Sequence, residues 1–195
     1  MPRKNTRPKP PRRRAAWHIY NRGVAGIAIF RDDADRDHFL QLLGRYLRDP
    51  FAGEIELHAA CLMTTHFHLV IVATDNARLS RFMQRLVAAY SIHYRRRHGG
   101  SGPLFDGPYR RKEIADPKQH RWTIAYVHDN HPSGVDYRYS THRFYRTGDA
   151  PGWLEVEAGL RVFGGRRRYL AYMDRKAARR ELDRGFFASG RRGDS

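Results

Sequence analysis

A histidine pair with one intervening residue, His66 and His68, is the pattern in this chain best suited to chemistry. The pair follows Thr64-Thr65 and begins an apolar run that is typical of a strand. Side chains two residues apart on a strand point to the same face, so the two imidazoles are expected to lie side by side. Because imidazole is a common neutral ligand of divalent cations, the pair predicts half of a metal site. The alternative is two half-buried histidines at the end of a core strand.

Tyr126 and Asn130 provide the other groups that such a site needs. They are four residues apart in the segment 116–130, whose apolar spacing predicts a helix, so they are expected on one helix face. A phenol oxygen can attack a phosphodiester, and an amide oxygen can ligate a hard cation. If this helix lies over the histidine strand, one metal would bind both imidazoles and the Asn130 oxygen. The same metal would polarise a phosphate that faces the Tyr126 hydroxyl.

The elements that must position these residues alternate in type along the chain. Strands are predicted at 15–23 with an extension at 26–30, in a pair within 56–72 that turns at 64–65, and at 105–114. Helices are predicted at 34–49, after a cap at Asp32 or Asp33, and at 78–97 and 116–130. The segment 133–146 is expected to be a loop. This order predicts an α+β fold, in which helices pack on an antiparallel β-sheet.

The chain of 195 residues is long enough for one domain with a substantial core. Residues 1–14 are rich in proline and basic residues and contain no acidic residue, so this arm is expected to be disordered in isolation. The residues of the predicted metal site and Tyr126 fall within 15–148, the predicted main domain. Residues 149–195 form a basic C-terminal extension, with a helix predicted around 166–184.

The charge balance predicts a nucleic-acid partner. The 37 Lys and Arg residues exceed the 20 Asp and Glu residues, which gives a formal net charge of +17. Three basic clusters are the predicted DNA contacts, and they contain Arg12, Arg13, Arg14, Arg95, Arg96, Arg97, Tyr109, Arg110, Arg111 and Lys112. The alternative for each cluster is an ordinary solvated basic surface.

Several classes of protein are disfavoured. No apolar run is long enough to span a bilayer, and no apolar signal segment follows the basic N-terminus. The single cysteine, Cys61, lies in an apolar strand and is expected to be a buried thiol in a reducing cytoplasm. The chain also lacks a phosphate-binding GxxxxGK loop. We therefore expect a cytoplasmic, nucleoid-associated protein that uses no ATP and has no membrane partner.

The sequence resembles the REP-associated tyrosine transposases, which are single-tyrosine HUH transposases. The resemblance is carried by the segments NRG at 21–23, IFRDDADRDHFLQLL at 29–43, HAACLMTTHFHLVI at 58–71, the stretch 79–110, and AYVHDNHP at 125–132. The family has Pro-Asn where this chain has Thr64-Thr65, and Pro-Val where this chain has His131-Pro132.

The resemblance implies a ferredoxin- or RRM-like HUH fold and a specific set of roles. His66, His68 and Asn130 match the family's ligands for Mg²⁺ or Mn²⁺, and Tyr126 matches its nucleophile. Such enzymes cut and rejoin single-stranded DNA at hairpins through a 5′-phosphotyrosine link. The implied partner is therefore single-stranded or hairpin DNA.

Two other functions stay open at the level of the sequence. One is a non-catalytic DNA- or RNA-binding module, in which binding survives Tyr126→Phe. The other is a metal-dependent hydrolytic nuclease, in which water attacks and Tyr126 is structural. The oligomeric state also stays open between a monomer and a homodimer.

Overall fold

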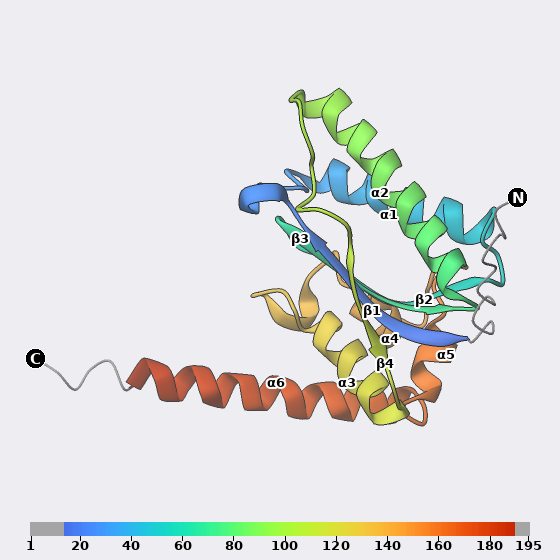
Figure 1. The fold of residues 1–195 in the computed structure, drawn as a ribbon. Coiled ribbons are helices and arrows are strands. Elements are labelled where there is room, and N and C mark those ends of the chain that lie inside the picture. Colours follow the sequence, from blue (N-terminus) through green and yellow to red (C-terminus); the bar gives the residue numbers. More distant parts are fainter. Residues whose placement is uncertain (1–13, 190–195) are drawn as a thin grey trace, which may run out of the picture.

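The computed structural model describes residues 14–189, which fold around a four-stranded sheet (Figure 1). The strands are antiparallel and lie in the order β2-β3-β1-β4. Their bounds are β1 Ala15–Arg22, β2 Ile55–Leu62, β3 His66–Ala73 and β4 Arg110–Ile114. The predicted strand pair with a turn at 64–65 is confirmed, since Met63 and His66 exchange backbone hydrogen bonds across that turn. β4 is an edge strand, and β3 lies inside the sheet.

Helices cover both faces of the sheet (Figure 1). One face carries α1 (Asp33–Arg48) and α2 (Asn76–His98). On the other side lie α3 (Pro117–His128), α4 (His142–Thr147), α5 (Val156–Arg161) and α6 (Arg166–Ser189). Because β3 is covered on both faces, all of its residues except His66 are buried. This arrangement confirms the predicted α+β fold with helices packed on an antiparallel sheet.

The three longest helices of the main body begin in the same way. The carboxylate of an aspartate at the N-cap accepts a backbone N–H three residues later, and the caps are Asp32, Asp75 and Asp116. Such a cap satisfies one of the unpaired N–H groups of the first turn. Of the two predicted cap candidates, Asp32 and Asp33, the structure shows that Asp32 caps the helix. In α3, Pro117 occupies the start of the helix, where its missing N–H costs nothing.

Three predicted elements differ from the structure. The strand predicted at 105–114 begins only at Arg110, and before it Phe105 forms an isolated bridge with Gly23. Residues 26–30 do not extend the first strand. Gly26 ends a short 3₁₀ turn, η1 (Val24–Gly26), and Ile29 and Phe30 donate their N–H groups to the Thr64 carbonyl instead of a neighbouring strand. The segment 133–146 is not only a loop, since it contains a 3₁₀ turn, η2 (Gly134–Asp136), and most of α4.

The core continues past residue 148. Leu154 forms a parallel bridge with Leu57, and the Glu155 N–H donates to the Leu57 carbonyl at 2.9 Å. Tyr169 in α6 is fully buried, and its hydroxyl lies 2.7 Å from Nδ1 of His128 at the end of α3. The predicted helix around 166–184 is confirmed by α6. The boundary at residue 148 stays a prediction, but the structure joins both sides of it through one set of buried contacts.

Cys61 is buried, as expected. Among residues 14–189, no helix has the length and apolar character that crossing a bilayer requires.

Candidate functional site

The alternation of β3 places His66 and His68 on the sheet face that α3 covers. Phe67, between them, points to the opposite face and packs against Phe39 of α1, with ring centroids 5.1 Å apart. The His66 and His68 rings are nearly perpendicular, with centroids 5.2 Å apart. His68 is buried, while His66 is half-buried. Both imidazoles are therefore held side by side at the beginning of β3.

Tyr126 on α3 lies directly over this histidine face. Its ring centroid is 5.7 Å from that of His68 and 5.8 Å from that of His18, and both contacts are edge-on. The structure thus brings together the two residues that the sequence offered as a ligand and a nucleophile, although they are 58 positions apart. Within residues 14–189, the Tyr126 hydroxyl has no hydrogen-bond partner, so it can turn toward a substrate.

Hydrogen bonds orient both imidazoles. Nδ1 of His66 lies 3.0 Å from Oγ1 of Thr65, and Nδ1 of His68 lies 3.0 Å from Nε2 of His18. In each ring the other nitrogen, Nε2, is left for a further partner. A ligand histidine in a metal site is commonly fixed in this way, through its second nitrogen.

Burial keeps these imidazoles neutral. Burial lowers the pKa of His66, and burial together with the neighbouring histidines lowers the pKa of His68 to about 3. Burial and the charge of Lys112 lower the pKa of His18 to about 4. A neutral His68 that donates its Nδ1–H to His18 keeps a lone pair on Nε2. Neutral imidazole is the form that binds metals.

Asn130 lies beyond α3, because the helix ends at His128 and Asp129 caps it. The predicted helix to residue 130 was therefore two residues too long. The Asn130 N–H instead donates to the Val127 carbonyl at 3.4 Å, in a turn. The next residue, His131, donates its backbone N–H to the Cys61 thiol, and Cys61 is the strand partner of His68. Paired residues of antiparallel strands share a face, so this turn lies over the histidine face.

The Asn130 side chain fits a ligand role. Its amide nitrogen is buried and has no hydrogen-bond partner among the described residues. A buried polar atom without a partner is costly. A half-turn of the amide exchanges its nitrogen and oxygen and would present the oxygen at this position.

No group of three His, Cys, Asp or Glu side chains within residues 14–189 is arranged to hold a metal. A cation at this face would therefore depend on two imidazoles and a neutral amide oxygen. With so few protein ligands, water or substrate phosphate must complete its coordination, as is usual for Mg²⁺ in phosphate-binding sites.

A pocket of about 410 Å³ opens beside His66. Its lining consists of Tyr20, Asn21, Arg22, Gly26, Thr65, His66 and Arg110. The guanidinium of Arg22 is paired with Asp106, whereas Arg110 is exposed and has no partner among the described residues. The pocket offers space and positive charge for a phosphate at one end of the histidine face.

The predicted contact segment Tyr109–Lys112 is divided between the two faces of β4. The register pairs Arg110 with Tyr20 and Lys112 with His18, so these two side chains lie on the face of the site. Tyr109 and Arg111 lie on the other face. The Tyr109 hydroxyl is 3.4 Å from Ser80 of α2, and Arg111 stacks over Trp17.

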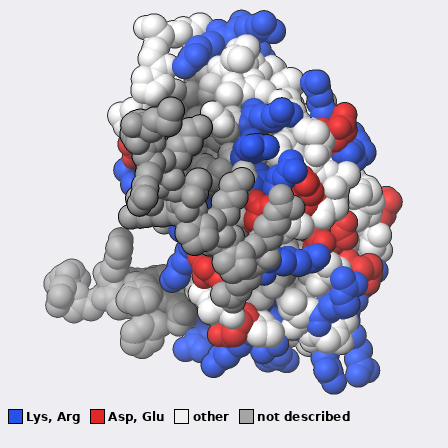
Figure 2. Space-filling model, turned by 45° about the vertical axis from the view of Figure 1, so that its right-hand side comes forward, with Lys and Arg blue, Asp and Glu red and all other residues white. Residues whose placement is uncertain are grey.

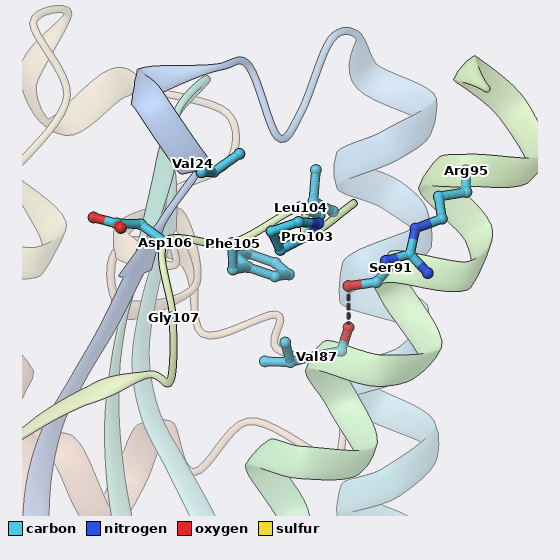
Figure 3. A pocket seen from close by; sticks show the side chains of 9 residues that line it. All are labelled: Val24, Val87, Ser91, Arg95, Pro103, Leu104, Phe105, Asp106 and Gly107. Carbon is cyan, nitrogen blue, oxygen red and sulfur yellow. Dashed lines mark hydrogen bonds between the residues drawn. The ribbon is translucent and has the colours of Figure 1, made fainter. Parts of the chain in front are cut away.

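The basic cluster at the end of α2 lies on the opposite side of the sheet from Tyr126. Arg97 pairs with Asp32 and Asp35, and Arg95 donates to the Gly102 carbonyl at 2.8 Å. Arg96 is exposed. The partner of Arg95 belongs to a loop that borders a second hollow (Figure 3).

This second hollow has a volume of about 540 Å³ and is mainly apolar. It lies between α2 and the segment 103–107, with Arg95 at its edge and a hydrogen bond from Ser91 to Val87 along one wall (Figure 3). None of the predicted catalytic or metal-binding residues lines it. This hollow is therefore not part of the candidate site around Tyr126 and His68.

The N-terminal cluster is described only in part. Arg14 forms an ion pair with Glu56 at 2.6 Å, while Arg12 and Arg13, with the rest of the arm at 1–13, lie outside the described residues. On the face seen in Figure 2, Lys and Arg side chains are widely spread, with Asp and Glu among them. On this face, the positive charge is therefore not gathered into one patch.

Three residues at the site were absent from the sequence-based set. His18 and Tyr20 project from β1 beside His68, with ring centroids 5.1 Å and 5.8 Å from it. Trp122 stacks on Tyr126 from one helical turn earlier. His18 and Tyr20 carry the same i, i+2 spacing as the histidine pair, and this was the available signal.

Comparison with known proteins supports the fold. No family model matches the chain, and no curated protein matches it. Among solved structures, the chain is similar to a REP-associated tyrosine transposase bound to a REP hairpin. The TM-score is 0.50 and the identity 16%, over 70% of this chain and 82% of the other. This likeness shows that the two proteins share a fold, in agreement with the expected HUH transposase-like architecture.

Proposed function

We propose that this protein cuts and rejoins single-stranded, hairpin-forming DNA, with Tyr126 as the nucleophile. The observation that carries the proposal is the position of Tyr126, whose ring lies 5.7 Å from His68, on a sheet face that also presents His66. The shared fold with a hairpin-bound tyrosine transposase supports the same assignment. The formal charge of +17 supports a nucleic-acid substrate.

The chain's own residues would act in three ways. His66, His68 and Asn130 would hold Mg²⁺ or Mn²⁺, through imidazole Nε2 atoms and an amide oxygen. When bound, such a cation supplies Lewis-acid polarisation of a phosphate. Arg110 and Lys112, on the site's face of β4, would attract the phosphate backbone, because each neutralised phosphate releases counterions.

The covalent step exchanges one phosphodiester for another. The Tyr126 oxygen attacks phosphorus and forms a new P–O bond, while the bond to the 3′ oxygen breaks and leaves a free 3′-hydroxyl. The phenol proton passes to water, and the released 3′ oxygen takes up a proton. A 3′-hydroxyl then reverses the reaction and frees Tyr126. The number of ester bonds is unchanged, so no ATP is needed.

Each chain offers one Tyr126 and can hold one covalent DNA end at a time. Exchange between two ends would therefore require a second chain or a second cycle. We place the reaction on single strands because a duplex pairs and stacks its bases, whereas the bases of a single strand are free to contact the protein.

The test is covalent trapping on a denaturing gel. Stem–loop DNA with single-stranded flanks, labelled at its 3′ end, is incubated with Mn²⁺ and with wild-type protein, Tyr126→Phe or Tyr46→Phe. Tyr46 is a half-buried tyrosine of α1, on the other side of the sheet, and serves as the matched control. A labelled adduct with the wild type and Tyr46→Phe, but not with Tyr126→Phe, supports the proposal. Cutting without an adduct would favour a hydrolytic nuclease, and binding without cutting would favour a DNA-binding protein.

A further inference from the structure

Trp122 is an exposed aromatic side chain beside the proposed nucleophile. Its side chain is 53% exposed, and among the described residues only Ile27 and Ile92 are comparable large hydrophobics. Its ring is parallel to that of Tyr126, at an interplanar angle of 9° and a centroid distance of 5.2 Å. Such an exposed tryptophan leaves apolar surface in contact with water, and covering that surface with a ligand is energetically favourable.

The stack has an inner and an outer side. The Tyr126 ring meets the edges of His18 and His68 on the sheet side, while Trp122 lies one helical turn earlier on the exposed stripe of α3. Within residues 14–189, the Trp122 indole N–H has no hydrogen-bond partner. The aromatic row therefore leads from the histidine face out to solvent.

Exposed lysines lie on the helix of Trp122 and on the neighbouring strand β4. Lys118 precedes it by one turn on α3 and is exposed, and Lys112 is exposed on the neighbouring edge strand. The other two exposed large hydrophobics belong to the segment after η1 and to α2, not to α3. A protein partner would require a larger contiguous apolar surface. An exposed aromatic ring on a helix that also carries an exposed lysine, next to a strand that carries another, matches a nucleobase joined to phosphates.

We propose that Trp122 is the stacking platform for one unpaired base of the bound strand, next to the phosphate that Tyr126 attacks. This inference deepens the proposed function and rests on it for the position of the scissile phosphate. Stacking would fix the nucleotide along the axis of α3, and its phosphate would then lie beside the Tyr126 oxygen. Stacking tolerates any base, so this contact would position the strand more than select its sequence.

The test measures binding without chemistry. Tyr126→Phe protein, with and without Trp122→Ala, is titrated into a fluorescent stem–loop that carries a single-stranded flank. Base–aromatic stacking predicts an affinity loss of about 5- to 150-fold on Trp122→Ala. Ile92→Ala is the matched control, because Ile92 is 50% exposed and lies on α2. Trp122→Phe should retain part of the affinity, and thermal melting shows whether each variant is folded.

A second arm locates the base. Each flank nucleotide is replaced in turn by an abasic nucleotide. The resulting loss of DNA affinity is measured for the protein with Trp122 and for the Trp122→Ala variant. The proposal predicts one DNA position at which abasic substitution no longer lowers the affinity once Trp122 is replaced by Ala. At every other position, the affinity losses from the abasic nucleotide and from Trp122→Ala should be additive. Additive losses at every position, or equal affinities of Trp122→Ala and Ile92→Ala, would overturn it. A change in sedimentation without a change in DNA affinity would also overturn it and would assign the indole to self-association.

The two proposals can fail separately. Loss of affinity at one flank position with no covalent adduct in the wild type would leave the stacking site in place on a non-catalytic binder. An adduct on Tyr126 with no role for Trp122 would preserve the proposed chemistry and remove the platform.

Discussion

Nε2 of His18 lies 3.0 Å from Nδ1 of His68, so a residue of β1 fixes the orientation of a residue of β3. The contact is diagonal, because His18 is the strand partner of Val70 and His68 is the partner of Tyr20. It occupies the His68 nitrogen that would not bind a cation. His18 is therefore a positioning residue for the proposed metal site.

Replacement of His18 should weaken metal binding without removing a ligand. Loss of an orienting partner typically reduces metal affinity about 10- to 100-fold, and we expect His18→Ala to fall in this range for Mn²⁺. Calorimetric titration of the DNA-free protein measures this effect directly. His38→Ala is the control, since His38 stacks on His93 and its helix, α1, covers the other face. Equal weakening by both variants would contradict the positioning role.

Replacement of the ligands themselves should have a larger effect on chemistry than on DNA binding. His68→Ala, His66→Ala and Asn130→Ala are each expected to reduce adduct formation by at least about 100-fold, because the proposed Lewis acid is lost. Affinity for the stem–loop in chelator should stay within about three-fold of the wild type, because the basic residues of β4 are intact. A gel-based rate and an anisotropy titration separate the two quantities. Undiminished adduct formation in excess chelator would contradict the metal role.

Acid should destabilise the fold through Asp35, which is fully buried between α1 and α2. Burial raises the pKa of this carboxyl, but hydrogen bonds from His98, the Arg31 N–H and Arg97 outweigh burial and hold the net pKa below its usual value. A lowered folded-state pKa means that the unfolded chain binds the proton first. The stabilisation is thus complete above the unfolded pKa of about 4 and is lost as the pH falls through the folded value.

The corresponding measurement is urea unfolding at pH 7, 5 and 3. Asp35→Asn should lower the free energy of unfolding at pH 7 by about 1–3 kcal/mol, since charged hydrogen bonds are lost, and should flatten its acid dependence. Asp149→Asn, at an exposed aspartate, should leave both quantities unchanged. An unaltered acid dependence in Asp35→Asn would show that other carboxyl groups cause it.

The C-terminal helix should be required for folding, because its Tyr169 hydroxyl reaches Nδ1 of both His128 and His142. Tyr169→Phe removes the hydroxyl partner of the Nδ1 atom of each buried imidazole, although Nε2 of His128 keeps Thr141, and should cost about 1–3 kcal/mol of unfolding free energy. Tyr172→Phe, at a half-buried tyrosine of the same helix, should cost less. A chain that ends at residue 148 should lose cooperative unfolding. Cooperative unfolding of that shortened chain would establish 15–148 as an independent domain.

The sequence was sufficient where a local rule determined the structure. Alternation on a strand predicted that His66 and His68 share a face, and an aspartate pair before α1 predicted a cap at Asp32 or Asp33, of which Asp32 is the cap. The sequence was insufficient where contacts between residues far apart in the chain determined the structure. His18 and Tyr20 carried the same alternation, but no local pattern states that β1 lies beside β3.

The remaining differences have physical causes of the same kind. α3 ends before Asn130, where the turn over Cys61 replaces helical hydrogen bonding. α4 forms within an expected loop because His142 is buried against Tyr169 of a helix that follows much later in the chain. Trp122 has the residue type of a core position, and only the packing of α3 leaves it exposed.

The most direct test of the account is the identity of the residue that carries the DNA. The covalent adduct is trimmed with nuclease and digested with trypsin, and the fragment 122–138 is sequenced by mass spectrometry. This fragment contains both Tyr126 and Tyr137, so it includes an internal comparison. The account predicts a nucleotide linked through its 5′ phosphate to Tyr126, and an unmodified Tyr137. A nucleotide linked to any other residue, or cut DNA with an unmodified Tyr126, would contradict it.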